Sequence, residues 1–148
     1  MGVSKISIFT VALLFSCASF SNENERCISA AEQEFDIPTN VLKAIAIHAQ
    51  QEKSAPELVG SMKLYKGAAN IAEKQISGDA NSNCQSYRMA AWWLMNPAGG
   101  REEKDIWVAV KQYFHGDKAI DDARDQSKRV KAIYESLVRP SSQATVTR

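Results

Sequence analysis

The stretch VLKAIAIHAQQEKS, residues 41–54, has the pattern of a helix with one buried face. Its apolar residues recur three and four positions apart, and this spacing places them along one side of an α-helix. They are Val41, Leu42, Ile45, Ala46 and Ala49. Thr39 or Asn40 precedes them and can cap the helix, because short polar side chains accept hydrogen bonds from its first backbone N–H groups. We therefore expect Ala49 to face the protein interior.

Helical spacing continues on both sides of this stretch, and no run of strand length alternates with period two. An earlier helix starts near Cys27 and ends at Asp36-Ile37-Pro38. Three or four more follow a loop at 53–60, with Gly78 as one stop signal and Asp105 and Asp121 as caps. The sequence predicts a compact all-α domain of five to six helices.

The N-terminal 21 residues have the composition of a secretory signal peptide. Lys5 supplies the positive charge, residues 6–15 are mostly apolar, and small residues surround Cys17. The apolar run is shorter than the roughly 20 residues of a membrane-spanning helix. We expect a signal peptide at 1–21, a folded domain at 22–139 and a disordered polar tail at 140–148.

Two processing routes follow from the residues around Cys17. Ser16-Cys17-Ala18 has small residues at the two positions that an ordinary signal peptidase reads, so cleavage would release a soluble protein into a bacterial periplasm, and we prefer this interpretation. Leu14-Phe15-Ser16-Cys17 resembles a lipobox, so lipidation of Cys17 is the alternative. Neither route leaves a transmembrane segment.

Charge and cysteine content limit the partners and the compartment. Without Lys5 the mature chain has 18 − 1 = 17 basic and 17 acidic residues, so nothing indicates binding to nucleic acid or an anionic membrane. Without Cys17 two cysteines remain, and in an oxidising compartment such a pair predicts one disulfide. Two buried free thiols are the alternative.

Several segments, taken in chain order, carry a family resemblance. Leu42-Lys43-Ala44-Ile45-Ala46 is followed by Gly60-Ser61-Met62-Lys63-Leu64, which is similar to a Gly-Leu-Met-Gln-Ile motif, and residues 107–113 fit Trp-x-Ala-Val-x-x-Tyr. Together with residues near Cys27, near Cys84 and in the last helix, they resemble the lysozyme-like lytic transglycosylases. The likeness covers roughly Cys27 to Leu137 and is greatest to small exported members that accompany secretion and conjugation machines. It implies a lysozyme-like fold and a Cys27–Cys84 disulfide.

The resemblance implies cleavage of peptidoglycan glycan strands by one glutamate, which acts first as acid and then as base. That glutamate follows the Ala-Ile-Ala motif by three residues, where this chain has Ala49. Gln50 and Gln51 replace the Ser-Gly that follows it in the family. Because a methyl group cannot transfer a proton, we expect a protein with impaired or absent catalysis.

Other candidate residues have weaker support. Glu52 is the nearest carboxyl, about 4.5 Å further along the helix, and a solvated helix end is the preferred interpretation for it. The resemblance implies that Met62 and Tyr113 line the sugar cleft. For Tyr113 an alternative of equal weight is a tyrosine at the edge of the core whose hydroxyl has a hydrogen-bond partner. His48 and His115 are expected at the surface or in turns. No metal site or cofactor is predicted.

Three functions follow from these observations. The first is a periplasmic, catalytically inactive relative of the transglycosylases that binds glycan or an envelope-spanning secretion or conjugation complex. The second is an active transglycosylase that uses Glu52. The third is a small helical protein-interaction module that does not bind glycan.

Overall fold

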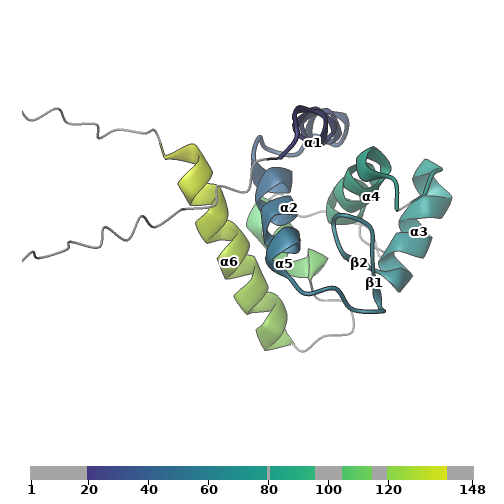
Figure 1. The fold of residues 1–148 in the computed structure, drawn as a ribbon. Helices are drawn as coiled ribbons and strands as arrows, with labels where there is room; N and C mark the ends of the chain where they lie inside the picture. Colours follow the sequence, from purple (N-terminus) through teal and green to yellow (C-terminus); the bar gives the residue numbers. More distant parts are fainter. Residues whose placement is uncertain (1–19, 80, 96–104, 115–119, 140–148) are drawn as a thin grey trace, which may run out of the picture.

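The computed structural model describes residues 20–79, 81–95, 105–114 and 120–139, and helices make up most of them (Figure 1). The elements are α1 (Asn22–Glu34), α2 (Val41–Gln51), β1 (Leu58–Val59), β2 (Leu64–Tyr65), α3 (Lys66–Ile76), α4 (Asn83–Met95), α5 (Ile106–Tyr113) and α6 (Ile120–Val138). The prediction of a mainly α-helical domain is confirmed. Residues 1–19 of the expected signal peptide, the expected tail at 140–148 and His115 lie outside the described residues.

Helix α1 begins at Asn22, earlier than the predicted start near Cys27. Ser21 is its N-cap, and the Ser21 side chain accepts a hydrogen bond of 3.3 Å from the backbone nitrogen of Asn24. In the described part of the chain, no helix combines the length and the apolar composition that crossing a bilayer requires.

Helix α2 is the most buried element, because α1, α4 and α6 all pack against it (Figure 1). Seven of its eleven residues are buried. Leu42 and Ile45 are fully enclosed, and burial of each aliphatic side chain of this size contributes about 1.5–3 kcal/mol. The apolar stripe read from the sequence is therefore only part of a helix that is covered on more than one face.

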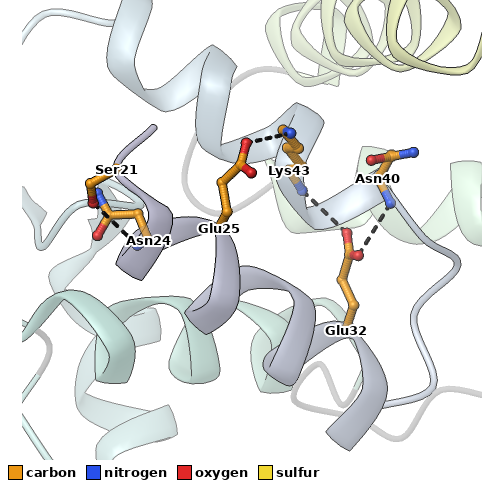
Figure 2. A network of polar contacts seen from close by, with 6 residues as sticks. All are labelled: Ser21, Asn24, Glu25, Glu32, Asn40 and Lys43. Atoms are coloured by element: carbon orange, nitrogen blue, oxygen red, sulfur yellow. Dashed lines mark hydrogen bonds and ion pairs between the residues drawn. The ribbon is translucent and has the colours of Figure 1, made fainter. Parts of the chain in front are cut away.

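A carboxylate from α1 caps the N-terminus of α2 (Figure 2). One oxygen of Glu32 accepts from the backbone nitrogens of Leu42 and Lys43 at 2.9 and 3.3 Å, and the other accepts from Asn40 at 3.2 Å. The expectation that Thr39 or Asn40 supplies the cap is wrong. Asn40 is at the N-cap position, but its backbone is left-handed, with φ 73°, and its side chain makes no capping bond.

The ends of the other helices agree in part with those predicted from the sequence. Asp105 caps α5 by accepting a 2.9 Å bond from the backbone nitrogen of Trp107, as expected. Gly78, with φ 140°, follows the end of α3. Asp121 is not the cap of α6, because the helix already includes Ile120, and Asp121 lies in its first turn.

A short antiparallel hairpin interrupts the helices and corrects the expectation of a chain without strands. Leu58 pairs with Tyr65 and Val59 pairs with Leu64. Two-residue strands are too short to show a period-two pattern, so apolar alternation could not reveal them. Gly60 opens the connecting turn with φ 70°, a conformation that glycine adopts without steric cost.

A disulfide and an ion pair are among the contacts that join α1 to α4. Cys27 and Cys84 form a disulfide with a Cα–Cα distance of 5.0 Å, within the usual range for such bonds. Arg88 adds an ion pair with both carboxylate oxygens of Glu34, at 2.7 and 2.8 Å. The predicted single disulfide is thus present, and it has the pairing that the resemblance implies.

Candidate functional site

A small pocket lies beside Ala49, with walls from α2, the hairpin, α5 and α6. Its volume is about 40 Å³. This is far below the roughly 300–1,000 Å³ of pockets that enclose a whole small-molecule ligand. Ala49, Met62 and Tyr113, which are far apart in the sequence, all line it. The chain therefore brings together the three positions that the resemblance assigns to the site.

Ala49 lies in the pocket wall on the last turns of α2 and is 5% exposed. Its inward orientation follows from the apolar spacing of the helix and is confirmed. Its neighbours in the wall include the apolar side chains of Ile45 and Leu58. The side chain of Ala49 is a methyl group, which can neither give nor take a proton.

Met62 reaches the pocket from the turn of the hairpin. Its backbone nitrogen donates a buried 3.1 Å hydrogen bond to the hydroxyl of Ser86 on α4, and this bond holds the turn against the helix. Lys63 follows with a left-handed backbone, φ 47°, and its ammonium group donates to the backbone oxygen of Glu52. The turn is thus tied both to α4 and to the end of α2.

Tyr113 enters the pocket from the last turn of α5 and is 7% exposed. Its ring packs edge-to-face against Phe114, with centroids 4.9 Å apart. The hydroxyl is buried and has no hydrogen-bond partner among the described residues, which contradicts the expectation of a satisfied hydroxyl. Removal from water raises the pKa of Tyr113 well above its usual range, so the phenol is neutral and can donate a hydrogen bond.

His48 is the main correction to the predicted site. It was expected at the surface, yet it is 2% exposed and lines the pocket. Its Nε2 lies 3.3 Å from the side-chain oxygen of Gln126 on α6, and the nitrogen of Gln126 donates a 2.9 Å bond to Asp122. The expectation failed because α6 covers the face of α2 that the sequence pattern left open.

Glu52 ends α2 as its C-cap and also lines the pocket. One carboxylate oxygen lies 3.5 Å from Nε2 of His48. Its side chain is 39% exposed, whereas a general acid of this chemistry is normally held in an apolar environment. The position agrees with the expected solvated helix end, although its contact with His48 was not anticipated.

Sequence reasoning missed His48 and Gln126 as pocket residues. The available signal was the pair Asp122 and Gln126, four residues apart and therefore on one face of a helix. The described residues contain no cluster of three or more His, Cys, Asp or Glu side chains that could bind a metal ion.

Comparison with known proteins gives no match for this chain, whether with family models, with curated proteins or with solved structures. The observations that remain are a mainly helical, disulfide-linked domain and a small, largely apolar pocket with a few polar atoms in its wall.

Proposed function

We propose that the protein is a lysozyme-like relative of the lytic transglycosylases that binds peptidoglycan glycan, or an envelope-spanning secretion or conjugation complex, without cleaving glycan strands. It would be exported to a bacterial periplasm, either as a soluble protein or anchored through Cys17. The observation that carries the proposal is that Ala49, Met62 and Tyr113 line one pocket. Their motifs are separated in the sequence, so their meeting at one site supports a shared origin with the family.

The absence of cleavage follows from the residue at position 49. The single-carboxyl mechanism needs a partly buried acid that is protonated near neutral pH. Ala49 has the required burial but no carboxyl. The pocket admits a small chemical group and is too small for a sugar ring, so a bound strand would lie across its mouth.

Digestion of purified sacculi tests the loss of catalysis. We expect the wild-type protein to release no anhydro-muropeptides, and Ala49→Glu to release them at a measurable rate. Ala49→Gln is the matched control, because it adds nearly the same volume without an acid. Clear release by the wild-type protein would contradict the proposal.

Retention on sacculi tests binding separately from catalysis. The wild-type protein is expected to sediment with sacculi, and Tyr113→Ala is expected to reduce the retained fraction. Tyr134→Ala, which changes a tyrosine of α6 outside the pocket, is the control. Absence of retention would favour the third function, a module that binds a protein partner.

One observation favours the second function, an active enzyme that uses Glu52. The Glu52 carboxylate lines the pocket and lies 3.5 Å from His48, so the site is not free of acids. If Glu52 were catalytic, wild type would release anhydro-muropeptides and Glu52→Gln would not. Equal behaviour of the two proteins in that assay excludes this function.

A further inference from the structure

We propose that the pocket beside Ala49 is a binding site for one small neutral amide group, which donates a hydrogen bond to Nδ1 of His48 and accepts one from the hydroxyl of Tyr113. Gln126 acts as the positioning residue that selects the histidine tautomer. The identity of the natural ligand rests on the proposed function, because the N-acetylated sugars of peptidoglycan carry such an amide.

The tautomer of His48 follows from a chain of side chains on α6. The nitrogen of Gln126 donates to Asp122 at 2.9 Å, which leaves the Gln126 oxygen to face Nε2 of His48 at 3.3 Å. An oxygen acceptor at this distance favours the tautomer that carries the proton on Nε2. In the neutral ring Nδ1 is then a hydrogen-bond acceptor.

Two buried polar atoms of the pocket residues have no hydrogen-bond partner in the described part of the chain. They are Nδ1 of His48 and the hydroxyl of Tyr113, and both side chains line the same pocket. Leaving such atoms unsatisfied costs free energy, so a ligand that pairs with both gains from each. Nδ1 of His48 needs a hydrogen-bond donor, and the neutral hydroxyl of Tyr113 can itself donate a hydrogen bond.

The chemistry of the pocket favours an amide over other small groups. An amide has an N–H donor and a carbonyl acceptor on adjacent atoms, which complements the two free positions. A carboxylate has no proton to give to Nδ1, and its charge is disfavoured by an apolar wall that includes Ile45, Ala49 and Met62. The two charged residues at the pocket, Glu52 and Lys63, already contact His48 and the Glu52 backbone, respectively.

Titration of the full-length, disulfide-bonded chain with acetamide tests the site by NMR. At neutral pH we expect saturable shifts of the backbone amides of Ala49 and Met62. The ¹⁵N resonances of the His48 ring should report a proton on Nε2, and Nδ1 should shift on binding as it accepts a hydrogen bond. Acetate at the same concentration is the charged control and is expected to bind more weakly.

Three variants separate the roles of the residues. Tyr113→Phe removes only the hydroxyl and is expected to weaken acetamide binding about fivefold, whereas Tyr134→Phe outside the pocket leaves it unchanged. Gln126→Leu removes the acceptor that selects the tautomer, so the ring should show a mixture of tautomers and a weaker acetamide complex. No saturable shift with acetamide, a proton on Nδ1 in the free wild-type protein, or acetate binding as tightly as acetamide would overturn the proposal.

The natural source of the amide is distinguished by two further probes. Tighter binding of N-acetylglucosamine than of acetamide, with no binding of glucose, identifies an amino sugar, whereas tighter binding of Gly-Asn-Gly identifies an amide side chain of a protein. Retention on sacculi without acetamide binding would overturn the amide site and leave the proposed function intact. Acetamide binding without retention on sacculi would keep the amide site and exclude the glycan-binding form of the proposed function.

Discussion

The buried contact between His48 and Gln126 joins α2 to α6 beside the pocket. Replacing Gln126 with leucine removes the acceptor and leaves the Nε2–H group of His48 dependent on its longer 3.5 Å contact with Glu52. The loss is expected to lower the free energy of unfolding by about 1–3 kcal/mol. In a protein that already carries His48→Leu, Gln126→Leu is expected to lower the free energy of unfolding by about 1 kcal/mol less than it does in the wild-type protein.

A double-mutant cycle measured by urea unfolding checks this coupling. The control cycle pairs His48→Leu with Gln112→Leu, because Gln112 lies on the exposed face of α5. Those two changes are expected to add within about 0.5 kcal/mol. Equal additivity in both cycles would show that the His48–Gln126 contact contributes nothing specific.

At the residue scale, the candidate site was predictable only where one helix face or one short motif sufficed. Ala49 follows from apolar spacing within α2, and Met62 and Tyr113 follow from short motifs that keep their order in the sequence. His48 was missed because its burial depends on α6, whose first residues come more than 70 positions later in the chain. A pattern within one helix has no information on which partner covers its polar side.

The cap of α2 is the clearest case at the scale of elements. Glu32 on α1 accepts three backbone hydrogen bonds from the N-terminus of α2, where a negative charge also interacts favourably with the helix dipole. Glu32→Ala is expected to lower the free energy of unfolding by about 1–2 kcal/mol. Glu73→Ala on the exposed face of α3 is the control in the same urea experiment, and an equal effect of both would contradict this role.

Glu32 and its neighbour Glu34 are expected to give opposite pH dependences. Burial raises the pKa of Glu32 in the folded protein, and this effect outweighs the backbone hydrogen bonds that lower it. The folded state then keeps the proton to higher pH than the unfolded state. The contribution of Glu32 to stability is therefore full below about pH 4.5 and falls as pH rises through the folded-state pKa. Relative to wild type, Glu32→Gln should become more stable as pH rises above 4.5.

The pKa of Glu34 is lowered, chiefly by its hydrogen bonds from Arg88. Its contribution is present above about pH 4.5 and is lost as pH falls through the lower folded-state pKa. Relative to wild type, Glu34→Gln should become more stable as pH falls below 4.5. Because the pair is exposed, its effect is small and should shrink in high salt. Urea midpoints from pH 3 to 7 for both variants check the two slopes, and slopes of the same sign would be inconsistent with the two pKa shifts.

The elements themselves and the disulfide could largely be predicted, whereas the polar contacts between helices could not. Periodic apolar residues located the helices, and Asp105 and Gly78 marked ends that the structure has. The Glu32 cap links positions eight to eleven apart through the packing of α1 on α2, so no local signal indicates it. A similar limit applies to the hairpin, whose strands are shorter than the pattern that would reveal them.

At the scale of the whole molecule, the disulfide divides the walls of the pocket between two parts of the chain. The loop that it closes, with a separation of 57 residues, contains α2 and the hairpin, while α5 and α6 lie beyond Cys84 (Figure 1). Closing a loop of this length reduces the conformational entropy of the unfolded chain. The entropic model gives a contribution of about 4 kcal/mol to the free energy of unfolding.

Replacing both Cys27 and Cys84 with serine is expected to lower the free energy of unfolding by about 4 kcal/mol. The urea m-value should rise at the same time, because an unfolded chain without the cross-link exposes more surface. Reductant is expected to lower the free energy of unfolding of the wild-type protein by a similar amount and to leave that of the double-serine variant unchanged. Reduction and substitution therefore serve as controls for each other. Equal unfolding midpoints for the wild-type and double-serine proteins, both without reductant, would show that helix packing alone holds α1 against α4.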